Sequence, residues 1–443
     1  MQSALRRTIG VAGWLALAWT ASLGVGAQAQ EAPLFSRPIG GGASLQLMDV
    51  SLGALVAAGG STADDDELEF LQGGNHDPRQ RGFTLQQIEL GVLGAVDPYF
   101  TAEAHLLYFI DTNGESQFEV EEAFAQTLAL PFGLHDHGLQ LEAGTFFTEF
   151  GRANPTHAHA WDWQDQPFVL TRFFGEDGSR GPGARVGWLL PLPWFAELHG
   201  GVQNSDGETQ VSFLADDEVF EERPLGGRPF GDRSVHSLGD LVWLTRLVQG
   251  IDVRDDTLTL QLGGSALFGP NATGNSGRTQ IYGVDFLAKW VPLDAQRGWP
   301  FVKLEAEWLL RRYRADAGIF DPADPATAVP SDTLVDQGFY LQTLWGFVPR
   351  WSAGLRWEHG QARGDNVAFD EDAGVLVPAR RSDDPYRARR HRVSPLLVFQ
   401  PTEFSRLRLQ YNWDRSPGLH GGEAHSVWLG LEFALGAHPA HTL

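Results

Sequence analysis

Along most of the chain, segments of about ten residues alternate apolar and polar side chains, which is the length of a strand that crosses a membrane. In one such segment Leu407, Leu409 and Tyr411 share one face, and Arg406 and Arg408 share the other. Successive side chains of a β-strand point to opposite faces, so each segment is predicted to be a strand with one apolar and one polar face. A soluble sandwich would show the same alternation, so this pattern alone indicates only an all-β fold.

The connections between these segments narrow the fold further. Short turns with a proline and a neighbouring aromatic residue recur, as in Asp97-Pro98-Tyr99 and Pro349-Arg350-Trp351. They alternate with long polar loops at about 61–81, 151–182, 204–237, 315–336 and 363–387. Aromatic side chains favour the lipid–water boundary, and membrane barrels have short turns at one end and long loops at the other. We therefore predict a transmembrane antiparallel β-barrel of about 16 strands, with short periplasmic turns and long extracellular loops.

Between Leu45 and Leu435 the alternation accommodates this strand number, although the turn near residues 250–256 lacks a proline. A barrel of this size leaves room for a water-filled lumen, whereas eight strands would be filled by side chains. In porins of this size one long loop often folds inward, and we expect this of the loop at 151–182.

The first thirty residues predict export. Two arginines are followed by an apolar stretch at 9–25 and by the small-x-small motif Ala27-Gln28-Ala29. This order is typical of a cleaved signal peptide at 1–29, which leaves a single barrel domain at 30–443. The chain has no cysteine and a net charge of −23, so disulfides are excluded and nucleic-acid binding is disfavoured.

Part of the chain resembles a known family. Residues 83–90, Asp97-Pro98-Tyr99, residues 120–124, and residues 141–146 leading to Phe150-Gly151 resemble the phosphate-selective porin O/P type of barrel. The resemblance covers roughly residues 80–155 and implies a channel. It does not carry phosphate selectivity over, because lysines line the anion path of that family and this chain has only Lys289 and Lys303.

The end of the chain is similar to the assembly signal of outer-membrane barrels. Trp428, Gly430, Phe433 and Leu435 take the characteristic positions, with tryptophan where a polar residue is usual. This similarity implies that the barrel-assembly machinery is a partner during biogenesis.

Charged residues on the predicted polar faces are the candidates for lining the pore. They comprise five arginines and three carboxylates of the wall, together with two acids of the long loop: Arg356, Arg390, Arg392, Arg406, Arg408, Glu305, Glu307, Glu358, Asp162 and Asp165. A ring of charged side chains in a narrow lumen sets ion preference. The alternative is that the arginines pair with the carboxylates and brace the wall, since buried charges need partners.

Two short histidine groups contain metal-ligand residue types, but neither spacing is diagnostic. His157, His159 and Asp162 form one group, and His135-Asp136-His137 forms the other. The simpler interpretation is that these are solvated loop residues, so we expect no metal and no cofactor and keep the first group as an alternative.

The pattern as a whole predicts an outer-membrane porin for passive diffusion of small hydrophilic solutes or ions in a Gram-negative bacterium. No nucleotide-binding or hydrolase motif is present, so we expect no enzyme activity. The alternatives are a substrate-specific transporter or a metal-binding barrel, with a barrel enzyme or an adhesin ranked lower. The expected partners are membrane lipids, lipopolysaccharide and solutes, and a homotrimer is one assembly that the pattern allows.

Overall fold

The computed structural model describes residues 36–40, 43–46, 48–254, 257–370 and 374–436. The predicted signal segment and its cleavage site lie outside these residues. The chain divides into two compact units, Met1–Gln46 and Leu47–Leu443. In the first unit, β1 (Ser36–Gly40) pairs antiparallel with β2 (Ala43–Gln46).

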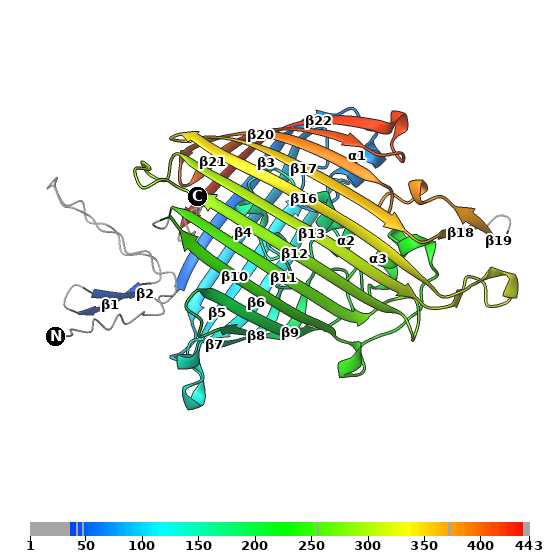
Figure 1. Cartoon of the computed structure of the whole chain (residues 1–443), viewed down its shortest axis with the longest axis horizontal. Coiled ribbons are helices and arrows are strands. Elements are labelled where there is room, and N and C mark those ends of the chain that lie inside the picture. Colours follow the sequence, from blue (N-terminus) through cyan, green and yellow to red (C-terminus); the bar gives the residue numbers. More distant parts are fainter. Residues whose placement is uncertain (1–35, 41–42, 47, 255–256, 371–373, 437–443) are drawn as a thin grey trace. The chain divides into compact units, whose positions relative to one another are not determined.

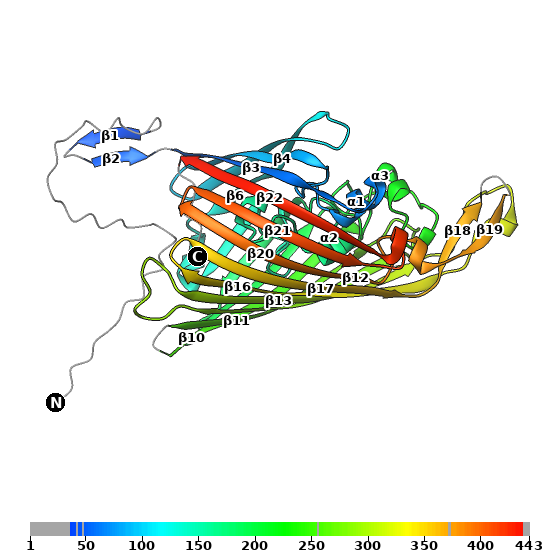
Figure 2. The same cartoon turned by 90° about the horizontal axis from the view of Figure 1, so that it is seen from above.

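The second unit is a closed barrel in which sixteen strands pair antiparallel with their neighbours (Figure 1). In chain order these are β3 (Met48–Ser61), β4 (Gly82–Ala95), β5 (Phe100–Ile110), β6 (Ser116–Thr127), β7 (Leu139–Phe147), β8 (Arg180–Leu189), β9 (Phe195–Gln203), β10 (Val242–Val253), β11 (Leu258–Pro270), β12 (Arg278–Trp290), β13 (Phe301–Ala315), β16 (Asp332–Val348), β17 (Trp351–Arg363), β20 (Arg390–Thr402), β21 (Ser405–Arg415) and β22 (Glu423–Gly436). The last strand closes the sheet against the first, so that β22 runs beside β3 (Figure 2). The predicted fold class is confirmed.

The alternation in the sequence explains which side chains face outward. Along β21 the apolar residues Leu407, Leu409 and Tyr411 are exposed, whereas Arg406 and Arg408 are buried. The other strands largely repeat this arrangement, which gives the barrel an apolar outer surface and a mostly polar interior. Buried apolar residues such as Ile281, Leu396 and Val398 are the exceptions. Closure also pairs every strand on both edges, as lipid requires of backbone amides.

The two ends of the barrel differ, as the sequence predicted. Short turns connect the strands at one end, and the aromatic residues Tyr99, Phe132, Trp194 and Phe404 are exposed there. The long loops lie at the other end, where the connections β5–β6, β11–β12 and β21–β22 are short. Some boundaries differ from the prediction: the first barrel strand begins at Met48, because the residues before it form the β1–β2 hairpin, and β10 continues through the predicted turn to Val253.

The loops contain short helices and hairpins. The helices are α1 (Asp65–Leu71), α2 (Phe168–Phe174) and α3 (Asp217–Glu222), with single 3-10 turns at Pro131–Gly133, His135–His137, Ala158–Ala160, Leu225–Gly227, Leu238–Asp240, Pro325–Thr327, Arg381–Asp383 and His420–Gly422. The hairpins are β14 (Gly318–Ile319) with β15 (Ala328–Val329), and β18 (Asn366–Asp370) with β19 (Val375–Ala379). Among the described helices, none has the length and hydropathy needed to cross a membrane.

Candidate functional site

The connection between β7 and β8, residues 148–179, lies against the inner wall of the barrel, and we call it the inner loop. Its bounds are close to the 151–182 expected from the sequence. Its helix α2 is buried at every position. Val169 and Phe173 pack in one apolar cluster with Ile281, Leu309 and Tyr340 of the wall. The inner loop is therefore anchored partly by burial of apolar surface.

Glycines of the wall make room for the inner loop. A Cβ atom at Gly338 would lie 2.5 Å from a methyl group of Val169, and one at Gly354 would lie 2.9 Å from the ring of Trp163. Neither distance is tolerated by carbon atoms in contact, so larger residues at these two positions would push the loop off the wall. Trp163 also donates its ring N–H to the carbonyl oxygen of Ser394 at 3.1 Å.

Asp165 is the main polar anchor of the inner loop. Its carboxylate accepts hydrogen bonds from Arg392 at 3.0 Å, Gln410 at 2.8 Å and Asn412 at 2.9 Å, and it also pairs with Arg356. Burial alone would raise the pKa of Asp165, but the two guanidinium groups outweigh it and hold the pKa below its ordinary value. The carboxylate is therefore charged at neutral pH and fully compensated.

The predicted arginines all lie on the inner face, and each one is paired. Arg356 lies 2.8 Å from Glu358, and Arg390 and Arg392 lie 2.8 and 2.9 Å from Asp414. All five predicted arginines are buried, and a buried charge needs such a partner.

Arg406 and Arg408 share one partner and also bind the loop. Glu432 lies 2.6 Å from Arg406 and 2.9 Å from Arg408. Arg406 donates to the carbonyl oxygen of His159 at 2.8 Å, and Arg408 donates to that of Trp163 at 2.8 Å. These guanidinium groups satisfy backbone acceptors that a loop inside a barrel would otherwise leave without partners.

The predicted wall carboxylates also hold the inner loop. Glu358 accepts the backbone N–H of Phe168 at 2.6 Å, at the start of α2, and Glu307 accepts that of Ala153 at 2.7 Å. Glu305 lies 3.3 Å from Arg152 and 3.2 Å from Lys303. The first two carboxylates are thus structural, whereas Glu305 belongs to the group described next.

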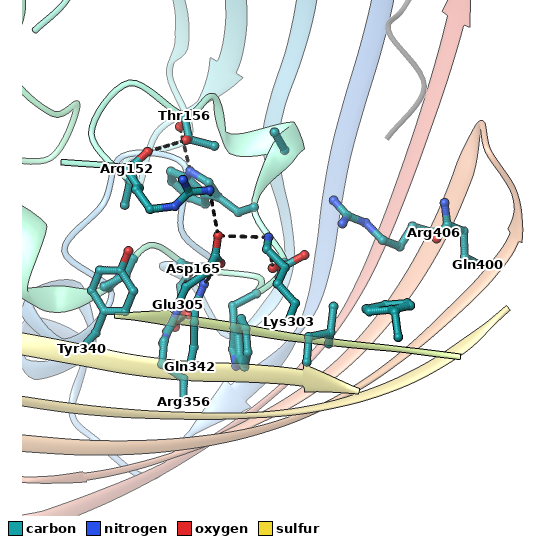
Figure 3. Close-up of a pocket in the computed structure, with 18 residues that line it drawn as sticks. Arg152, Thr156, Asp165, Lys303, Glu305, Tyr340, Gln342, Arg356, Gln400 and Arg406 are labelled. Atoms are coloured by element: carbon teal, nitrogen blue, oxygen red, sulfur yellow. Dashed lines mark hydrogen bonds and ion pairs between the residues drawn. The ribbon is translucent and has the colours of Figure 1, made fainter. Parts of the chain in front are cut away.

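A cavity of about 240 Å³ lies between the inner loop and the wall (Figure 3). Its charged lining consists of Arg152, Asp162, Asp165, Lys303, Glu305, Arg356 and Arg406. Asp162 accepts a hydrogen bond from Lys303 at 2.9 Å. Burial would raise the pKa of Asp162, but the ammonium group of Lys303 outweighs it and holds the pKa below its usual range.

The histidines of the inner loop are not next to Asp162. His157 and His159 instead contact carboxylates of the wall, with His159 2.6 Å from Glu89 and His157 2.9 Å from Glu122. Asp162, the third residue of the metal alternative His157, His159 and Asp162, pairs with Lys303 in the structure.

Several residues of the site were not singled out from the sequence: Glu89, His105, Glu121, Glu122, Lys303, Gln410, Asn412, Asp414 and Glu432. All except Glu121 lie on the polar face of a strand, so the alternation assigns them to the interior. Glu121 is buried beside Glu122 because the pairing of β5 with β6 shifts register at this position, and alternation does not predict that irregularity. The sequence does not indicate which residue of the inner loop each of them contacts.

No family model matches this chain. An uncharacterised protein of Aquifex aeolicus (strain VF5) is 28% identical over 419 residues, covering 89% of this chain and 80% of that relative. Among solved structures, the outer membrane channel DcaP of Acinetobacter baumannii matches with a TM-score of 0.50 and 10% identity, covering 88% of this chain and 96% of that chain. The chain has the fold of an outer-membrane porin. An anion-selective porin from Comamonas acidovorans also matches, with a TM-score of 0.48 and 9% identity over 88% of this chain and 100% of that chain.

Proposed function

We propose that the protein is an outer-membrane channel through which small hydrophilic solutes or ions diffuse passively. The observation that carries this proposal is a closed sixteen-strand barrel that is apolar outside and polar inside, with a charged cavity beside its inner loop. Such a barrel is wide enough for an aqueous lumen. An inward loop narrows that lumen, so the side chains of the cavity would meet the passing solute.

The cavity supports a weak preference for anions. Four basic residues (Arg152, Lys303, Arg356, Arg406) and three acidic residues (Asp162, Asp165, Glu305) line it, which gives a net charge of +1. The chain as a whole has a net charge of −23, which would favour cations at the mouth of the pore. Charges farther than about 8–10 Å are screened at physiological salt, so the cavity would outweigh the distant loops.

The resemblance to the phosphate-selective porin O/P type does not make phosphate the solute. Only two lysines are present in the chain, and only Lys303 lines the cavity. Arginine binds anions through a planar fork, whereas lysine acts as a compact charge, so the two linings differ in what they select. The lining therefore fits small anions as a class best, without selecting one particular anion.

Single-channel recording in a planar bilayer tests the proposal. The refolded chain without residues 1–29 should give discrete current steps, and the same preparation after heat denaturation should give none. A reversal potential in a salt gradient should have the sign of a weakly anion-selective pore. A folded barrel that inserts but gives no steps would contradict the channel, and reproducible turnover of an ester or peptide substrate would support a barrel enzyme instead.

The same proposal includes a location in the outer membrane, with lipopolysaccharide and the barrel-assembly machinery as partners. The apolar outer surface fits lipid, and the C-terminal strand β22 ends in the pattern described above for assembly signals. Cross-linking in native membranes would distinguish a homotrimer from a monomer.

A further inference from the structure

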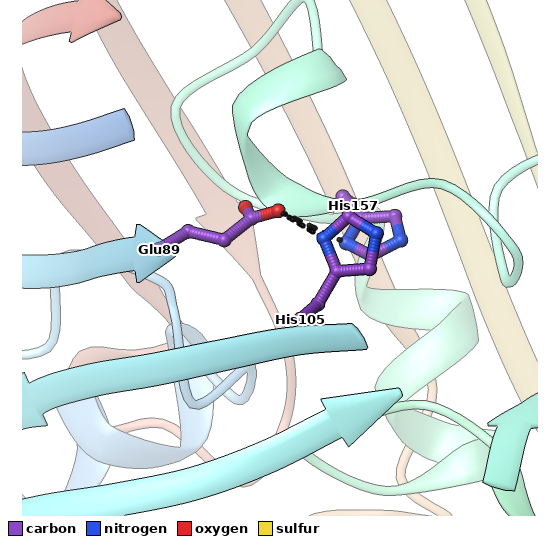
Figure 4. Close-up of side chains that lie close together, drawn as sticks. All are labelled: Glu89, His105 and His157. Carbon is purple, nitrogen blue, oxygen red and sulfur yellow. Dashed lines mark hydrogen bonds and ion pairs between the residues drawn. The ribbon is translucent and has the colours of Figure 1, made fainter. Parts of the chain in front are cut away.

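Three histidines and four glutamates lie together where the inner loop meets strands β4, β5 and β6 of the wall. Glu89 lies at the centre of these contacts. Its Oε1 atom is 2.7 Å from Nδ1 of His105 and 3.6 Å from Nδ1 of His157 (Figure 4). Its other oxygen lies 2.6 Å from Nδ1 of His159. This cluster is separate from the ion pairs that involve Asp165.

The spacing matches the first coordination shell of a metal ion. Glu89, His105 and His157 each offer one ligand atom, and these atoms all lie within 4.8 Å of one another. Ligand atoms at about 2.0–2.2 Å from a tetrahedral ion are separated by roughly 3.4 Å, so only small side-chain shifts are needed.

Glu121 of β6 is a candidate for a fourth ligand because it contacts His157. Its Oε2 atom lies 2.7 Å from Nδ1 of His157. Both atoms are buried, and neither has a hydrogen-bond partner of acceptable geometry. The carboxylate oxygen and the ring nitrogen face each other at this distance, as two ligand atoms of one ion would.

The opposite nitrogens of both histidines are also positioned as in metal sites. Nε2 of His105 lies 2.8 Å from Glu103, and Nε2 of His157 lies 2.9 Å from Glu122. A metal-ligating histidine almost always donates its other ring N–H to a carboxylate, a backbone carbonyl or water, which fixes the tautomer and leaves the first nitrogen free to bind the ion. Here both carboxylates orient the two Nδ1 atoms towards Glu89.

We propose that Glu89, His105, Glu121 and His157 bind one divalent transition-metal ion. Two imidazole nitrogens and two carboxylate oxygens are ligands that Zn²⁺ accepts in tetrahedral geometry, and the two carboxylates balance its charge. Because His157 belongs to the inner loop and the other three ligands belong to the wall, the ion joins the loop to β4, β5 and β6.

The test is zinc binding to the folded, full-length barrel in detergent after treatment with EDTA. Equilibrium dialysis with elemental analysis should find one tightly bound Zn²⁺ per chain. His157→Ala and His105→Ala should abolish this binding, and Glu122→Gln should weaken it by about 10- to 100-fold. The matched control is the double change His135→Ala with His137→Ala, which removes two exposed histidines of similar spacing and should leave the tight site unchanged.

X-ray absorption of the zinc-loaded wild type supplies a readout that does not depend on the variants. It should show four nitrogen or oxygen ligands at about 2.0–2.2 Å, with outer-shell scattering from two imidazole rings. The proposal is overturned if the wild type binds no stoichiometric zinc, if the ligands are water alone, or if the His135/His137 control loses the ion while His157→Ala keeps it. None of these measurements requires conduction, so the metal site and the channel can fail separately.

Discussion

Replacing Asp165 by asparagine should release the inner loop from the wall. The carboxylate is buried between Arg356 and Arg392, and its loss leaves two buried guanidinium groups with too little negative charge around them. Removing one partner of a buried ion pair costs about 3–5 kcal/mol. Since about 1.4 kcal/mol is a factor of ten, the population of the detached loop should rise by roughly two to three and a half powers of ten.

Two measurements report this change. Trypsin should cut Asp165→Asn after Arg152 and Arg172 of the inner loop much faster than wild type, because cleavage follows the population of the open form. Single-channel currents should become larger and noisier. Asp162→Asn is the matched control, because the loss of Asp162 leaves Lys303 with Glu305 at 3.2 Å, so its effect should be small. Equal cleavage and equal conductance in wild type and Asp165→Asn would refute the anchoring role, provided that both variants migrate as folded barrels.

Three further predictions follow from the structure. The unheated protein should migrate faster on electrophoresis than the heated protein, and identical migration would contradict a closed, detergent-resistant sheet. Lys303→Gln should shift the reversal potential towards cations and Asp162→Asn towards anions, and two unchanged potentials would mean that the cavity does not set selectivity. Asp77, in the connection between β3 and β4, accepts the backbone N–H of Gln166 of the inner loop at 2.9 Å. Burial and the nearby Asp165 raise the pKa of Asp77 to about 8, so the folded protein favours the protonated form and the attachment of the inner loop weakens as the pH rises from about 4 to about 8. Trypsin should therefore cut the inner loop faster at pH 8.5 than at pH 7, and this increase should exceed the increase measured on a free peptide. Asp77→Asn should reduce the increase to that of the free peptide.

The sequence predicts the barrel well because lipid imposes a local rule. In β21 each residue must face either lipid or the interior, so Leu407, Leu409 and Arg408 reveal their sides without knowledge of any partner. The strand number and the two kinds of connection follow from the same rule. The hairpin before Met48 was missed because β2 continues the alternation of the first strand, and periodicity does not say which neighbour a strand pairs with.

The site is less predictable because its contacts join residues that are distant in the sequence. Asp165 meets Arg392 across 227 positions, and this pairing depends on the path of the inner loop rather than on any local motif. The histidine cluster depends in addition on strand register, since Gly91 is the partner of His105 while Glu89 is the partner of Leu107. A shift of one residue in that pairing would turn one of the two side chains towards lipid.

The anchors of the inner loop bear on how a channel of this kind would be controlled. Three kinds of contact attach the inner loop to several strands of the wall. They are the apolar packing of α2, the ion pairs of the buried Asp165, and the backbone N–H groups bound by Glu307 and Glu358. Detachment of the whole loop requires all of these contacts to break together, so thermal motion alone would rarely detach it in the wild type. The narrow region would then be fixed, and selectivity would come from the side chains of the cavity rather than from a moving gate. The proposed metal ion would add an anchor whose strength depends on the concentration of the ion, so the metal content of the surroundings would adjust this contact of the loop.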